Sequence, residues 1–158
     1  MLDLNGIKVN RKINMRLASF TDYSLRVLIY IALKGDERST VAEIADKYKI
    51  SRNHLVKVVH NLSSMGIIDS YKGKGGGITL STAPGQIVIG NLVRQLEEDS
   101  PLVECFGNSG NCIINPTCKL KSALIIAQNK FYEALNEYTL DDLISNKAKL
   151  VEIFTADN

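Results

Sequence analysis

The chain has 158 residues, 45% of them hydrophobic and 23% charged, and its formal net charge at pH 7 is +2. This length buries one core, so we expect one domain with an appended element, built mainly from helices because strand-like runs are short. The sequence lacks the roughly 18 consecutive apolar residues that a membrane-spanning helix requires, so no membrane partner is expected.

Residues 1–14 contain no apolar core of signal-peptide length, so export is not expected. We interpret them as a leader or tag-like extension, or as the product of an alternative start. We expect the folded unit to begin at Met15 and the protein to be cytoplasmic and bacterial. In that reducing compartment structural disulfides are disfavoured, and three cysteines could not all pair within one chain.

Three helices are predicted first. Apolar residues recur at helical spacing after Ser19, which indicates a buried first helix. The sequence from Thr40 to Glu43 forms a capping box, which predicts a short second helix. Ser51 is expected to cap a third helix that ends at Gly66 and has one apolar stripe.

The segments IIDSY and ITLST flank the turn KGKGGG, which predicts a two-stranded hairpin with Lys72 and Lys74 at its tip. Three helices and a basic hairpin make a winged helix-turn-helix domain, here over residues 15–84. The fold class is therefore mainly α, a winged helix-turn-helix with a two-stranded β-wing and a long C-terminal dimerisation helix.

A DNA-binding surface is predicted because the polar side of the third helix lies opposite its apolar stripe. Between Lys47 and Lys74 there are six basic residues against one acid. An ordinary amphipathic surface helix and a simple edge ribbon are the alternatives for each part taken alone. Asn53 suits adenine and Arg52 suits guanine, although such side chains contact phosphate more often. The candidate DNA-binding residues are Ser51, Arg52, Asn53, His54, Lys57, Lys72, Lys74, Gly75 and Gly76.

Residues 85–118 are predicted to hold a linker helix, IVIGNLVRQLE, and then a cysteine-rich loop without periodicity. The helical period returns over residues 119–143. This apolar stripe favours a homodimer, with packing on its own domain as the alternative. Thr139 is expected to cap a last short helix, and the tail 144–158 is expected to be loosely held.

All three cysteines lie in that loop, spaced as Cys105-x6-Cys112-x5-Cys118. Three thiolates suit a soft metal, either in an iron–sulfur cluster or as zinc. Structural zinc usually has four ligands at shorter spacing, and both histidines lie in the third helix, so zinc fits less well. A reactive redox cysteine pair is the competing interpretation.

A family resemblance rests on MRLASFTDYSLRVLIYIAL, on the third helix, on GKGGGITL and on LVECF…CIINPTCKLKSAL. From about Met15 to Leu143 the chain resembles the winged-helix iron–sulfur repressors, the family of the nitric-oxide-sensing NsrR type and the IscR type. The cysteine surroundings are more similar to the NsrR type, because the IscR type places a ligand histidine where this chain has Lys119 to Lys121. The resemblance implies a fourth ligand from the other subunit, here Asp22. An acid in a first helical turn also simply favours the positive end of the helix dipole.

We therefore expect a homodimeric DNA-binding transcriptional repressor that is not an enzyme. It would bind an inverted-repeat operator in double-stranded DNA and carry an iron–sulfur cluster, with 4Fe–4S favoured over 2Fe–2S and nitric oxide as the ligand it senses. The alternatives are a regulator of the same fold that senses iron, cluster supply or redox state, and a cluster carrier without DNA binding. An enzyme with a nucleophilic cysteine needs a nearby base, and no histidine follows His60.

Overall fold

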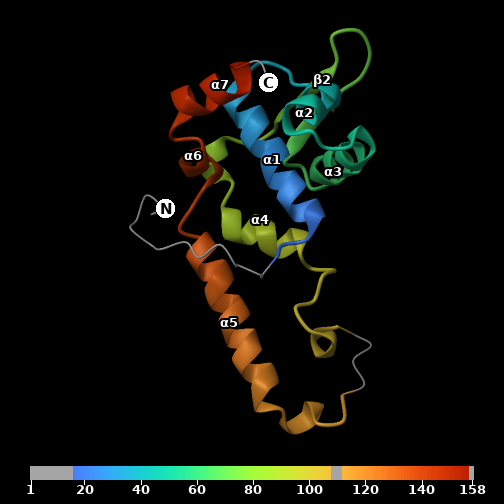
Figure 1. The fold of residues 1–158 in the computed structure, drawn as a ribbon, viewed down its shortest axis with the longest axis vertical. Coiled ribbons are helices and arrows are strands. Elements are labelled where there is room, and N and C mark those ends of the chain that lie inside the picture. The colour runs from blue at the N-terminus through green and yellow to red at the C-terminus, as the bar shows by residue number, and fades with distance from the viewer. Residues whose placement is uncertain (1–15, 108–111, 157–158) are drawn as a thin grey trace.

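The computed structural model describes residues 16–107 and 112–156, and Figure 1 shows their arrangement. The predicted extension 1–14 and the predicted start at Met15 lie outside these residues. The described α-helices are α1 (Ser19–Lys34), α2 (Val41–Tyr48), α3 (Arg52–Ser64), α4 (Ile89–Leu96), α5 (Lys119–Leu135), α6 (Leu140–Leu143) and α7 (Lys147–Thr155). The strands are β1 (Ile68–Tyr71) and β2 (Gly77–Leu80), which pair antiparallel. The predicted fold class, a mainly helical winged helix-turn-helix, is confirmed.

The core is built around α1, which α3 contacts on one side and α6 and α7 contact on the other (Figure 1). Val27, Leu28 and Ile31 of this helix have no exposed surface. Their spacing of one, three and four residues puts them on one side of the helix. This side meets the apolar stripe of α3, which is also buried and consists of Leu55, Val58, Val59 and Leu62.

The N-termini of α2 and α3 differ in how they are capped. At α2 the predicted capping box is present, since the Glu43 amide donates to Thr40 Oγ1 at 3.1 Å and the Thr40 amide donates to Glu43 Oε2 at 3.3 Å. At α3 the residue before the helix is Ser51, as predicted, but its side chain makes no capping hydrogen bond. That part of the prediction is wrong, because only the Ser51 carbonyl accepts bonds from the amides of His54 and Leu55.

The wing has the predicted hairpin form, and its register pairs Ile68 with Leu80 and Tyr71 with Gly77. A third segment joins it, because Ser39 forms an antiparallel bridge with Ile78. The hairpin is therefore tied to the polypeptide between α1 and α2.

The expectation of a loosely held tail is wrong, because the described residues after Leu143 include helix α7. Its Phe154 ring lies edge-on to two rings of the core, with centroids 5.2 Å from Tyr30 and 5.3 Å from Tyr48. Partial burial of this aromatic side chain holds a short helix whose own periodicity is weak. The cap of α6 by Thr139 is confirmed.

None of the described helices combines the length and the apolar character that spanning a membrane requires.

Candidate DNA-binding surface and cysteine loop

The outer side of α3 carries the predicted recognition residues. Arg52, Asn53, His54 and Lys57 are all exposed, and so is Ser51 before them. Basic and amide side chains on an open helix can donate to phosphates and to base edges. The structure therefore brings these five candidates onto one accessible surface.

His54 has a neighbour that sequence analysis missed. The ring of Tyr23 from α1 stacks on the His54 imidazole with centroids 6.3 Å apart and planes at 23°. The two residues are far apart in the sequence, so no local pattern signals this contact.

The wing presents its two predicted lysines to solvent, since Lys72, Lys74 and Gly75 are all exposed. Gly75 has a φ of 78°, which favours glycine. At Gly76 a Cβ atom would overlap the carbonyl oxygen of Tyr71, so a side chain there would distort the turn.

A hollow of about 450 Å³ separates α3 from the wing. Its lining combines three valines with a histidine, a lysine and two serines. Val56 in this hollow is 50% exposed although it belongs to α3. The lining residues are Val41, Val56, Val59, His60, Ser63, Ser70 and Lys72.

The three cysteines form no disulfide. Cys105 lies half-buried in a 3₁₀ turn, Cys112 is exposed, and Cys118 is half-buried at the N-terminal end of α5. The Lys121 amide donates to Cys118 Sγ at 3.4 Å. The thiolate is the form of cysteine that binds metal.

Within residues 16–107 and 112–156, no three histidine, cysteine, aspartate or glutamate side chains lie close enough together to hold a metal ion. The structure therefore does not gather the three thiols, and Asp22 does not join them. The donor set itself fits an iron–sulfur cluster, because all three thiols are free and none is fully buried.

Asp22 lies in the first turn of α1, as predicted. Its carboxylate accepts two hydrogen bonds from Arg26 Nε, at 3.1 Å and 3.0 Å. This hydrogen bonding raises the pKa of Arg26. Both side chains are nearly half exposed, so the pair is accessible from outside.

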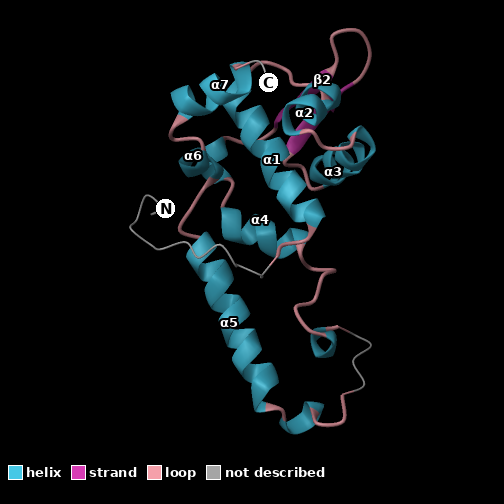
Figure 2. Cartoon of the chain, in the orientation of Figure 1, coloured by secondary structure: helices cyan, strands magenta, loops and turns pink. Residues whose placement is uncertain are grey.

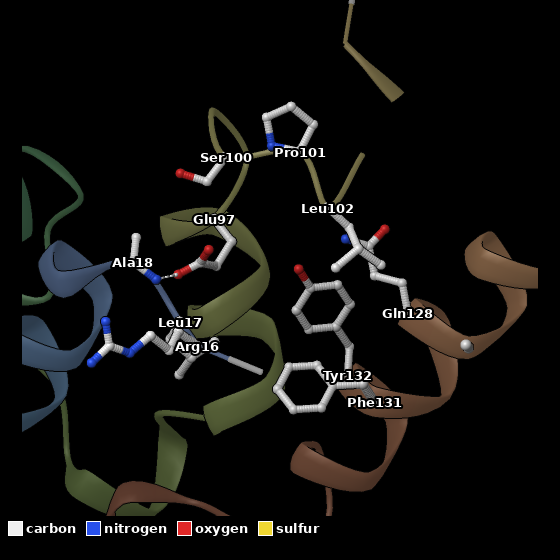
Figure 3. A pocket seen from close by; sticks show the side chains of 11 residues that line it. Arg16, Leu17, Ala18, Glu97, Ser100, Pro101, Leu102, Gln128, Phe131 and Tyr132 are labelled. Atoms are coloured by element: carbon white, nitrogen blue, oxygen red, sulfur yellow. Dashed lines mark hydrogen bonds between the residues drawn. The ribbon is translucent and has the colours of Figure 1, made fainter. Parts of the chain in front are cut away.

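A pocket of about 460 Å³ marks the meeting point of α1, α4, α5 and the start of the cysteine loop (Figure 3). On one side the Ala18 amide donates to Glu97 Oε1 at 2.9 Å, which the dashed line in Figure 3 marks. On the other side Phe131 and Tyr132 of α5 face Leu102 of the loop (Figure 3). This hydrogen bond therefore joins the residue before α1 to the residue directly after α4.

Helix α5 projects away from the winged domain as one long helix (Figure 2). Its exposed apolar side chains include Leu120, Ile125 and Ile126, with exposed fractions of 66%, 42% and 62%. Apolar surface of this kind along one helix is typical of a protein interface.

Known proteins resemble the whole of this arrangement. The family model of the Rrf2 iron-dependent transcriptional regulators matches residues 17–146. The HTH-type transcriptional regulator NsrR of Halalkalibacterium halodurans is 47% identical over 138 residues, which cover 86% of this chain and 94% of that protein.

Two solved structures share the fold. CymR, the global cysteine regulator of Bacillus subtilis, superposes with a TM-score of 0.66 at 26% identity, covering 84% of this chain and 98% of that one. T. potens IscR has a TM-score of 0.65 at 20% identity, covering 85% and 89%, and shows the fold alone. The regulatory class agrees with the prediction that the protein is not an enzyme. The chain therefore belongs to the Rrf2 family of iron-dependent transcriptional regulators.

Proposed function

We propose that the chain is a homodimeric repressor whose affinity for its operator is controlled by an iron–sulfur cluster and lowered by nitric oxide. The single observation that carries this proposal is the set of three free thiols within one loop that runs between α4 and α5. The 47% sequence identity with the NsrR of Halalkalibacterium halodurans, over 138 residues, supports nitric oxide as the signal.

The DNA contacts would come from α3 and the wing. The exposed side of α3 suits the major groove, with Arg52, Asn53 and Lys57 at base edges or phosphates. Lys72 and Lys74 would bind flanking phosphate. A symmetric dimer places two such helices roughly 34–36 Å apart on one face of DNA, so the operator is an inverted repeat.

The dimer would form through α5. Its exposed Leu120, Ile125 and Ile126 leave an apolar surface that a second copy can cover.

Cys105, Cys112 and Cys118 would hold the cluster, most simply a 4Fe–4S cluster with 2Fe–2S as the alternative. Asp22 from the second protomer is the proposed fourth ligand. Its carboxylate is paired with Arg26 in the structure, so ligation requires this ion pair to open. When bound, the cluster supplies iron that coordinates nitric oxide at the expense of thiolate ligands.

The chain's own contacts would carry a change in the loop to the DNA-binding surface. Glu97, directly after α4, holds the Ala18 amide at the start of α1, and Tyr23 of α1 stacks on His54 of α3. A shift of the loop at Leu102 would reach the Glu97–Ala18 contact through the pocket that these three residues line. Helix α1 would carry the shift on to Tyr23 and His54.

The test is a titration of anaerobically purified, cluster-loaded protein with nitric oxide while operator binding is followed. We expect occupancy to fall from nearly full to nearly empty, which requires a change in affinity of about 10⁴-fold. An unchanged affinity contradicts the nitric-oxide proposal. A second titration, which compares loaded with cluster-free protein, identifies a sensor of iron or cluster supply.

A further inference from the structure

Arg38 lies between α1 and α2 and contacts the wing at two points. Its Nη1 donates to the carbonyl oxygen of Gly75 at 2.8 Å. Its guanidinium carbon lies 4.2 Å from the centroid of the Tyr71 ring. Tyr71 ends β1 and Gly75 belongs to the turn, so one side chain touches both an arm of the hairpin and its tip.

We propose that Arg38 braces the wing and is a positioning residue for the DNA contacts of Lys72 and Lys74. This inference rests on the proposed DNA-binding function.

The wing needs an external brace because its glycine-rich turn does little to fix its own conformation. The turn contains Gly73 with a φ of 88° and Gly75 with a φ of 78°. Within the turn, the Gly76 amide donates to the Gly73 carbonyl at 2.9 Å. Glycine loses more conformational entropy on ordering than any other residue, and a two-stranded hairpin alone is only marginally stable.

The backbone at Arg38 is itself fixed, so the brace has a firm base. The next residue, Ser39, is fully buried and pairs with Ile78 in both directions. The Ile78 amide donates to the Ser39 carbonyl at 2.7 Å, and the Ser39 amide donates back at 3.0 Å. The segment is anchored to β2 by its backbone, while the Arg38 side chain reaches Tyr71 and the turn.

The chemistry of these contacts requires arginine. A planar guanidinium can stack on a ring with its face while it donates from its edge, which a lysine ammonium cannot do. Both partners are uncharged, and none of the ion pairs among the described residues includes Arg38. The brace therefore leaves the positive charge of the wing intact for phosphate.

The experiment uses the full-length dimer and a short duplex that the wild-type protein selects from a random-sequence library. Binding is measured at several salt concentrations for Arg38→Ala, Arg38→Lys, Tyr71→Leu and the control Tyr71→Phe. Amide hydrogen exchange of Gly76 and Ile78 is measured without DNA, and circular dichroism verifies the fold.

Without the brace, a smaller fraction of molecules holds the wing in the conformation that contacts DNA. We therefore expect Arg38→Ala to weaken DNA binding roughly 10-fold. Arg38→Lys and Tyr71→Leu should also weaken it. The Arg38→Ala/Tyr71→Leu double variant should bind no more weakly than Arg38→Ala, because Arg38→Ala already removes the ring contact that Tyr71→Leu removes. Tyr71→Phe keeps the ring and should bind like wild type. The Gly76 amide should exchange faster in Arg38→Ala.

A direct phosphate contact by Arg38 gives a different pattern. Arg38→Lys would then bind nearly as well as wild type, wing exchange would be unchanged, and the salt slope of Arg38→Ala would fall by about 0.9. In a Lys72→Ala/Lys74→Ala background, a brace predicts no further loss from Arg38→Ala, whereas a direct contact predicts the full loss. A wild-type protein that selects no duplex contradicts the proposed function, and hydrogen exchange still decides the brace.

Discussion

The winged domain differs from the region formed by the cysteine loop and α5 in how many of its apolar side chains are buried within the single chain. In the winged domain Leu28 and Ile31 are fully buried. In the cysteine loop and the first part of α5 the pattern reverses, since Ile113 is 97% exposed, Leu120 is 66% exposed, and the thiols are unpaired. The first region buries its apolar side chains within a single chain. The second exposes apolar side chains and free thiols, which is typical of a surface that binds a partner and a soft metal.

The Cys118→Ala variant tests most directly whether the second region depends on a metal. If the second region depends on a metal, the variant should lose the visible absorption of the anaerobic protein and about 10⁴-fold in operator affinity. The far-ultraviolet circular dichroism should not change, because the thiol is not part of the core. Ser122→Ala, an exposed change on the same helix, is the matched control and should keep the colour.

Leu28→Ala tests the first region. Removing a fully buried leucine side chain should lower the free energy of unfolding by about 2–5 kcal/mol, measured by urea denaturation. Leu120→Ala deletes the same atoms from an exposed site and should change the unfolding free energy of the monomer by less than about 0.5 kcal/mol. Equal losses in the two variants would remove the distinction between the regions.

Ile126→Asp tests whether α5 is an interface. A charge placed in an apolar interface should raise the dimer dissociation constant at least 10-fold, an effect of about 1.4 kcal/mol or more. Analytical ultracentrifugation measures it. An unchanged dimer mass would show that another surface joins the protomers, and Ser122→Asp, an exposed change of one charge on the same helix, controls for charge alone.

Thr40→Ala removes the cap of α2 within the winged domain. The variant should lose about 1 kcal/mol of unfolding free energy, because the Glu43 amide loses its side-chain acceptor. Ser51→Ala is the matched comparison and should cost much less, since the Ser51 side chain caps nothing in the structure. A larger cost for Ser51→Ala would contradict the described helix start.

The smallest effect concerns pH. Burial raises the pKa of Glu43, but hydrogen bonds from Tyr30 and Lys34 outweigh it and hold the pKa below its ordinary value of 4.5. A lowered pKa in the folded state contributes stability above pH 4.5 that is lost as the pH falls through the folded value. Because Glu43 is partly exposed, the contribution should be below about 1 kcal/mol. Glu43→Gln should flatten the dependence of unfolding free energy on pH in this acidic range.

Local patterns were sufficient to predict most of the winged domain. The capping box at Thr40 involves residues three apart, and the glycine turn with its lysines lies within one short stretch. The contacts that sequence analysis missed join distant residues. Arg38 and Gly75 are 37 positions apart, and Ala18 and Glu97 are 79 apart, so their pairing depends on the tertiary packing.

The site was predicted less completely for a related physical reason. The spacing of the cysteines predicts the ligand atoms, but among the described residues the three thiols are not gathered, because they lie on separate turns. Asp22 is found where its position in α1 predicts, yet it is bonded to Arg26 of its own chain. The proposed ligation therefore requires a second protomer and the cluster itself.

The most direct measurement is the operator affinity of one anaerobic preparation from iron-replete cells, before and after removal of its iron by a chelator. The account predicts a coloured, iron-containing dimer that binds tightly and loses most of its affinity with the metal. A colourless preparation without iron that binds the operator at full strength would contradict it.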